Sequence, residues 1–280
     1  MSYLQNLHAH STYCDGENTL EEMVISAVEK GFDSIGFSGH VTMTDYPIHA
    51  TIPNYPRYWM TEEQTEMYKK EISQLKEKYK DKINILCGIE YEIFSDVNIS
   101  GYDYVIGAVH HIPAKSDFVD VDLSAEFTKR VINDYFDGDG MKYAKTYYEQ
   151  MLKLADYPEI DIIAHFDLLT KFREQEMLFD DESKEYKNIA LETLRELSKK
   201  AKFFEINTGA ISRGYRTTPY PAPFILKEMN NLGCKIVITT DCHDGNFLDC
   251  CMKEAKEFAK ECGFKDYYVL KENGFEAIKL

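Results

Sequence analysis

Residues 104–111 read YVIGAVHH, an apolar run that ends in two histidines. Five further runs of strand type are followed within three residues by a histidine, a glutamate or an aspartate: 3–7, 34–37, 83–89, 160–164 and 235–240. Side chains that follow parallel strands gather at one end of a barrel, where imidazole and carboxylate groups can bind metal ions. The sequence therefore predicts an α/β barrel with a metal site at the C-terminal ends of its strands.

Helical patterns separate these runs. Apolar residues of 19–30 fall on one helical face, and Thr61 with Gln64 forms a capping box that opens a helix to about residue 79. Further helices are predicted at 124–135, 141–155, 181–200, 221–232 and 246–262, with strands at 203–207 and 267–270. This alternation predicts parallel strands joined by right-handed crossovers. Neither a polar linker nor a repeat divides the chain, so we expect one domain over residues 1–280.

Composition narrows the class of protein. A chain of 280 residues with 44% hydrophobic content is long enough for one α/β barrel. It has no apolar stretch of the roughly 18 residues that a membrane span needs, and its N-terminus lacks the features of a signal peptide. Seven scattered cysteines suit neither a disulfide framework nor a zinc clip. A net charge of -16 argues against nucleic-acid binding. We therefore expect a cytoplasmic protein with neither membrane nor nucleic-acid partners.

Two segments without helical periodicity, 41–60 and 209–223, are expected to be loops on the metal-binding rim, because such loops form the substrate pocket of a barrel. His49 in the first loop could contact substrate, although a surface histidine is the simpler interpretation. The second loop carries Arg213 and Arg216.

The first candidate ligands are His8 and His10. They lie two residues apart, so the alternation of a strand directs both imidazoles to the same side, where both can bind one cation. Asp15 precedes a glycine, a pair that is typical of an ordinary turn. Together with His40 and His243, however, Asp15 becomes a candidate ligand.

The other candidates each end a buried strand. A carboxylate such as Glu90 is costly there unless it is paired or bound to metal, and a salt bridge to a lysine is the alternative. His110 and His165 could each be a core histidine. Because the pattern recurs on several strands, one shared metal site is favoured over separate explanations. Cys242 lies between two candidates, Asp241 and His243, and strand alternation predicts that it packs away from them.

The order of these motifs resembles a known family. It runs HxH, Asp, Gly-His, Gly-Ile-Glu, Val-His-His, Ala-His-Phe-Asp and Thr-Asp-Cys-His. In this it resembles the PHP (polymerase and histidinol phosphatase) superfamily, and the resemblance to its histidinol-phosphatases covers residues 5–245. It implies a distorted (β/α)7 barrel with a trinuclear metal centre. Every ligand position of the family is filled by a competent residue type, which implies a catalytic member.

The resemblance also implies how the ligands share three divalent ions. The implied sets, ion by ion, are His8, His10, Glu90 and Asp241; Glu90, His110 and His165; and Asp15, His40 and His243. Glu90, Asp241 and His243 would be the catalytic groups among them. Nitrogen and oxygen ligands fit zinc, manganese or iron, and the sequence does not choose among these.

The activity implied by the resemblance is hydrolysis of L-histidinol phosphate to L-histidinol and phosphate, in histidine biosynthesis. A metal centre can generate a nucleophile from water near neutral pH and offset the charge of a phosphate ester. One alternative is a PHP phosphoesterase that acts on a nucleotide or another small phosphate ester. A second alternative is a non-catalytic metal-binding module. The sequence leaves the oligomeric state open.

Guanidinium groups should assist in binding the phosphate ester, because each can bind two phosphate oxygens at once. Arg213 and Arg216 follow a strand end, and similar phosphatases place an arginine there. Arg173 is a further candidate, and a solvated surface arginine is the alternative for each.

Three other residues could contact substrate. His111 would face away from the site in a regular strand, and could act as general acid or substrate contact only if the strand has already ended. Asp117 or Asp120 could meet the amino group of histidinol.

Overall fold

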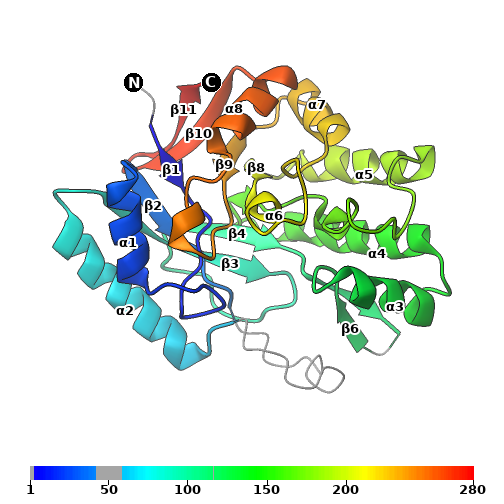
Figure 1. Cartoon of the computed structure of the whole chain (residues 1–280), viewed down its shortest axis with the longest axis horizontal. Helices are drawn as coiled ribbons and strands as arrows, with labels where there is room; N and C mark the ends of the chain where they lie inside the picture. The colour runs from blue at the N-terminus through cyan, green and yellow to red at the C-terminus, as the bar shows by residue number, and fades with distance from the viewer. Residues whose placement is uncertain (1–2, 42–58, 116) are drawn as a thin grey trace.

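The computed structural model describes residues 3–41, 59–115 and 117–280. Its central sheet has seven parallel strands in the order β1-β2-β3-β4-β7-β8-β9 (Figure 1). Their bounds are β1 Gln5–Asn6, β2 Ser34–Phe37, β3 Asn84–Glu92, β4 Tyr104–Ala108, β7 Ile162–Ile163, β8 Phe203–Asn207 and β9 Ile236–Thr239. All seven lie within or next to runs that the sequence predicts as strands.

The residues that follow β1 and β9 bring the two edges of the sheet together. The backbone N–H of Cys242 donates to the carbonyl of His8 at 3.0 Å, and the N–H of His10 donates to the carbonyl of Cys242 at 2.8 Å. Below this bridge, the Asn6 amide donates to the Thr240 hydroxyl at 2.6 Å. The sheet is thus a nearly closed barrel, which confirms the predicted distorted (β/α)7 fold.

Helices cover the outside of the strands, with α1 and α2 on one side and α3, α4 and α5 on the opposite side (Figure 1). The helices are α1 Leu20–Glu29, α2 Glu62–Tyr79, α3 Ala125–Tyr135, α4 Gly140–Lys153, α5 Lys184–Leu197, α6 Gly209–Ser212, α7 Pro223–Asn231 and α8 Met252–Glu261. Thr19 and Thr61 cap α1 and α2 through capping boxes, as expected for Thr61. Among the described helices, none has both the length and the apolar character to cross a bilayer.

The predicted helix at 246–262 is wrong in its first part. Asp244 caps a short 3-10 turn, η4 (Gly245–Phe247), and Cys251 then takes a left-handed φ of 54°. Because a left-handed residue interrupts a right-handed helix, α8 begins only at Met252. The other 3-10 turns are η2 (Leu154–Asp156) and η3 (Leu168–Thr170).

Two antiparallel hairpins were not predicted. β5 (His111–Ala114) pairs with β6 (Asp117–Asp120), and β10 (Asp266–Lys271) pairs with β11 (Gly274–Lys279). The predicted strand at 267–270 therefore belongs to a hairpin and not to the barrel.

The β10–β11 hairpin lies beside β1, near both chain ends (Figure 1). The Gln5 side chain joins it to β1: its amide donates to the Leu270 carbonyl and its oxygen accepts from the Leu270 N–H, both at 2.7 Å. Leu270 also packs with residues of the barrel interior, including Leu7, Ile106 and Val237. The hairpin thus shares apolar packing with the barrel, and the single domain over residues 1–280 stays a prediction.

Tyr104 fills the barrel interior beneath the metal-binding rim. Its ring lies against Gly36 and Gly88, where an added Cβ would collide with it, and its hydroxyl donates to the carbonyls of Leu7 and Phe37. The two glycines on β2 and β3 therefore make room for a large side chain that ties three strands together.

Gly88→Ala is expected to destabilise the fold by about 1–3 kcal/mol, the usual cost of overpacking a core. Urea denaturation would measure the loss. In a Tyr104→Leu background the same substitution should cost less, because the colliding ring is gone. An equal cost in both backgrounds would contradict this packing.

Candidate metal centre

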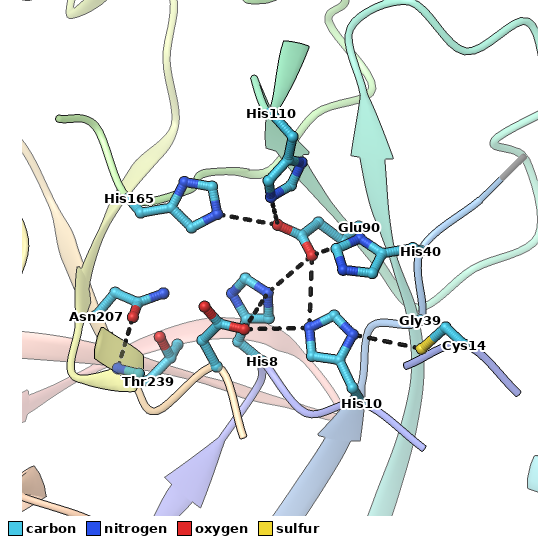
Figure 2. Close-up of polar contacts among 12 residues, drawn as sticks. His8, His10, Cys14, Gly39, His40, Glu90, His110, His165, Asn207 and Thr239 are labelled. Carbon is cyan, nitrogen blue, oxygen red and sulfur yellow. Dashed lines mark hydrogen bonds and ion pairs between the residues drawn. The ribbon is translucent and has the colours of Figure 1, made fainter. Parts of the chain in front are cut away.

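Glu90, near the end of β3, lies at the centre of the rim (Figure 2). Its side chain is 1% exposed and is surrounded by five imidazoles from the ends of four neighbouring strands. The shortest nitrogen–oxygen distances to its carboxylate are 3.1 Å from His8, 3.5 Å from His10, 3.1 Å from His40, 3.3 Å from His110 and 3.1 Å from His165. One carboxylate thus faces ring nitrogens on both of its oxygens.

Asp241 and Asp15 extend the cluster on the side of β1 and β9. Asp241 Oδ1 lies 3.2 Å from His10 Nε2, and Asp15 Oδ2 lies 3.1 Å from His243 Nε2. Asp15 Oδ1 lies 3.7 Å from His40 Nε2. All nine candidate ligands named from the sequence therefore lie together at one end of the barrel.

The donor set fits metal ions. Four buried atoms of the cluster have no hydrogen-bond partner: Nε2 of His8, Nε2 of His10, Oδ1 of Asp15 and Oε2 of Glu90. Buried polar atoms rarely stay unpaired, because each costs the free energy of its desolvation. Cations between them would satisfy all four atoms.

Candidate groups of ligand atoms within 4.8 Å of one another partly match the implied sets. They are His10, Asp15, His40 and His243; His8, His10 and Asp241; and His40, Glu90 and His110. His10 and His40 each belong to two groups. His165 is in none of these, although its Nε2 faces the Glu90 carboxylate. The division of nine ligands among individual ions stays a prediction.

Electrostatics favour the protonation states that metal binding needs for the carboxylates and for His10. Despite burial, neighbouring carboxylates hold the pKa of His8 and of His110 well above its usual value, so cations would have to displace protons from these two rings. Burial opposes ionisation of Glu90, but His8, His40 and His110 outweigh it and hold the pKa of Glu90 well below its usual range. The pKa of Asp241 is likewise lowered despite its burial, mainly by Arg213 and His8. Burial, with His243 and His40 nearby, lowers the pKa of His10 to about 3. The carboxylates are therefore ionised and His10 is neutral near pH 7.

Glu205 in β8 supports the site from behind and was missed by sequence reasoning. Its Oε1 lies 2.6 Å from His8 Nδ1. It also accepts hydrogen bonds from the His165 backbone N–H, the Asn207 amide and the Thr239 hydroxyl, at 2.8, 2.9 and 2.6 Å. Glu205 thus fixes the His8 ring and ties neighbouring strands together. The signal that could have found it is a carboxylate inside the apolar run 203–206, although Glu205 does not end the run as Glu90 does.

Glu92 fixes the ring of His110 in the same way. Its Oε2 lies 2.9 Å from His110 Nδ1 and accepts the His110 backbone N–H at 2.8 Å. A carboxylate on the outer nitrogen of a histidine leaves the other nitrogen directed at the metal.

Glu205→Gln is expected to weaken metal binding by about 10- to 100-fold, the usual cost of losing such an outer partner. Chelator competition would measure the affinity. Glu228→Gln removes a carboxylate on α7 that pairs with Arg195 on α5; it is the control and should leave the affinity unchanged. Equal affinities of the Glu205 and Glu228 variants would contradict the assigned role.

A pocket of about 240 Å³ opens beside the cluster. Metal-ligand candidates line one side, and its other lining residues are Val41, Trp59, Glu92, His111, Asp120, Asp122, Leu123, Lys171, Arg213 and Tyr215. His111 reaches the pocket because β4 ends at Ala108 and His111 begins β5. Of the two aspartates considered for the amino group, Asp120 lines the pocket and Asp117 is not among its lining residues.

The three candidate arginines are placed differently. Arg213 lines the pocket and donates to the Asp241 carboxylate at 3.0 Å. Arg216 is 3% exposed and donates to the Thr170 hydroxyl, with its guanidinium 4.3 Å from the Tyr220 ring centroid. Arg173 pairs with Asp181 and Glu182, both at 3.0 Å. The structure therefore brings Arg213, and neither Arg173 nor Arg216, to the pocket wall.

Cys242 is buried, with its thiol donating to the Asp244 carbonyl, which agrees with the predicted packing away from the ligands. His49 lies outside the described residues, as does most of its loop.

A known protein family and a curated relative are similar to this chain. The family model described as the PHP domain matches residues 6–209. The chain belongs to the PHP domain family. The "Probable histidinol-phosphatase" of Schizosaccharomyces pombe is 25% identical over 91% of this chain and 86% of its own length.

Two solved structures share the fold. A Listeria monocytogenes protein superposes with a TM-score of 0.77 at 19% identity, covering 89% of this chain and 99% of its own. Histidinol phosphate phosphatase from Lactococcus lactis, solved with zinc, L-histidinol and phosphate, gives a TM-score of 0.70 at 22% identity, covering 98% of both chains.

Proposed function

We propose that this protein is a metal-dependent phosphatase that hydrolyses L-histidinol phosphate to L-histidinol and phosphate. The observation that carries the proposal is a single pocket that is lined by six of the nine candidate metal ligands together with Arg213 and Asp120. The name of the fission-yeast relative and the ligands of the Lactococcus lactis enzyme support the same substrate.

The centre is proposed to hold three divalent ions of zinc, manganese or iron, on the nine side chains described above. When bound, such ions lower the pKa of water towards about 7 and offset the charge of a phosphate ester. Glu90, with ring nitrogens on both of its oxygens, is the side chain best placed to serve two ions.

The pocket wall supplies the remaining functions of the reaction. Arg213 is the guanidinium that can bind phosphate oxygens. Asp120 offers negative charge to the cationic amino group of histidinol, whereas the Asp122 carboxylate already pairs with Lys171 at 2.7 Å. His111 is proposed as the general acid for the leaving alkoxide: it lines the pocket, with Nδ1 3.6 Å from Glu92 and Nε2 4.0 Å from Asp120.

A steady-state assay over a panel of phosphate esters tests the substrate. We expect kcat/KM to be highest for L-histidinol phosphate, and the activity to vanish on chelation and return with added metal. Faster turnover of a nucleotide or another small phosphate ester would assign the site to that substrate instead. Bound metal without turnover of any ester would indicate a non-catalytic module.

We also propose that the protein works in the cytoplasm. All seven cysteines are free thiols, which is the state that a reducing compartment maintains.

A further inference from the structure

We propose that Cys14 is a positioning residue for His10, in which the thiol sulfur accepts the Nδ1 proton and so directs Nε2 into the metal centre. This inference rests on the proposed metal centre and adds to it a residue that no ligand motif includes.

The contact is direct. Cys14 Sγ lies 3.4 Å from His10 Nδ1, on the side of the ring away from Glu90 (Figure 2). His10 is fully buried, and its other nitrogen faces Glu90 at 3.5 Å and Asp241 at 3.2 Å. The turn after β1 holds Cys14 in place, because the Ser11 carbonyl accepts the backbone N–H groups of Cys14 and Gly16 at 2.9 and 3.0 Å.

Asp15 is the competing partner for the same nitrogen, and the geometry favours the thiol. Asp15 Oδ1 lies 3.5 Å from His10 Nδ1 and accepts no hydrogen bond from any described residue. A distance of 3.5 Å exceeds the normal length of an N–H···O hydrogen bond. Because sulfur is a larger atom than oxygen, the 3.4 Å between Cys14 Sγ and His10 Nδ1 is a hydrogen-bonding distance. Asp15 also faces His243 and His40, which suits a metal ligand.

Cys14 occupies the position that a carboxylate occupies at two of the other rings, His8 and His110. Glu205 lies against the outer nitrogen of His8, and Glu92 against that of His110, at 2.6 and 2.9 Å. Outer partners of this kind fix the tautomer and the orientation of a ligand histidine. A thiol is a weak acceptor compared with a carboxylate, so His10 is held less firmly than its neighbours. His10 belongs to two of the candidate ligand groups. With Nδ1 protonated only Nε2 can bind an ion, so the orientation of the ring decides which group it serves.

The test uses zinc-loaded protein and measures the rate at which a chromophoric chelator removes the metal. Cys14→Ala should release zinc about 10-fold faster than the unmodified protein, at the lower end of the effect of losing an outer partner. Cys14→Ser should restore slow release, because a hydroxyl can also accept the Nδ1 proton. Cys262→Ala removes another buried thiol, one that contacts the Pro223 carbonyl, and should release zinc at the unmodified rate.

Nitrogen-15 NMR of the unmodified zinc-loaded protein gives a second readout that needs no variant to fold. We expect His10 to carry its proton on Nδ1. A proton on Nε2, or equal zinc release from the Cys14→Ala and Cys262→Ala variants, would overturn the inference. Both measurements are independent of hydrolysis, so either result would refute the role of Cys14 while leaving the proposed phosphatase activity intact. Failure of the unmodified protein to bind zinc would refute both proposals.

Discussion

Glu90→Gln is expected to abolish metal binding and phosphatase activity together. The carboxylate faces nitrogens of His8 and His40 through one oxygen and of His110 and His165 through the other. An amide keeps the shape of the side chain but removes the charge that binds cations. We expect kcat/KM to fall by more than about 100-fold, and bound metal to fall in parallel. Loss of a residue that only hydrogen-bonds to a metal ligand costs about 100-fold at most. Elemental analysis and a steady-state assay on the same sample would measure both.

Glu159→Gln, which changes an exposed carboxylate remote from the rim, is the control and should alter neither quantity. Full metal occupancy in the Glu90→Gln protein would show that Glu90 is not a shared ligand. Thermal unfolding would separate loss of metal from loss of fold.

Arg213→Ala is expected to raise KM for the phosphate ester by about 10- to 100-fold. Hydrogen bonds to charged groups contribute roughly 1.5–3 kcal/mol each, and a tenfold change in binding corresponds to about 1.4 kcal/mol. Arg213 also donates to the Asp241 carboxylate, so metal content should be compared at saturating metal, where we expect it to be retained. Arg213→Lys should give an intermediate KM, because an ammonium keeps the charge but not the planar fork.

Arg216→Ala provides the matched control. Arg216 is buried against Thr170 and Tyr220, so its loss should lower the free energy of unfolding while leaving KM nearly unchanged. A rise in KM for Arg216→Ala, with none for Arg213→Ala, would reverse the assignment of the phosphate ligand.

The barrel and the ligand cluster were predictable for a local reason. Five of the nine candidate ligands directly follow a short apolar run, and parallel strands bring such positions to the same end of a sheet. The rule places His8, Glu90, His165 and Asp241 without knowledge of loop structure. The rule does not find Glu205, which lies within its strand and not at the end.

Features that depend on distant contacts were harder to predict. The β10–β11 hairpin is recognisable only through its packing on the barrel, and the break before α8 comes from a left-handed Cys251 in an otherwise helical pattern. Arg213 and Arg216 lie three residues apart, yet one lines the pocket and the other is buried. The local backbone after β8, and not residue type, decides between them.

The most direct test of the account is a reconstitution of metal-free protein in which bound metal and L-histidinol phosphate hydrolysis are measured together. We expect activity to be absent without metal and to rise as divalent ions bind, up to three per chain. Hydrolysis by protein that elemental analysis shows to be free of metal, and that chelators do not affect, would contradict it.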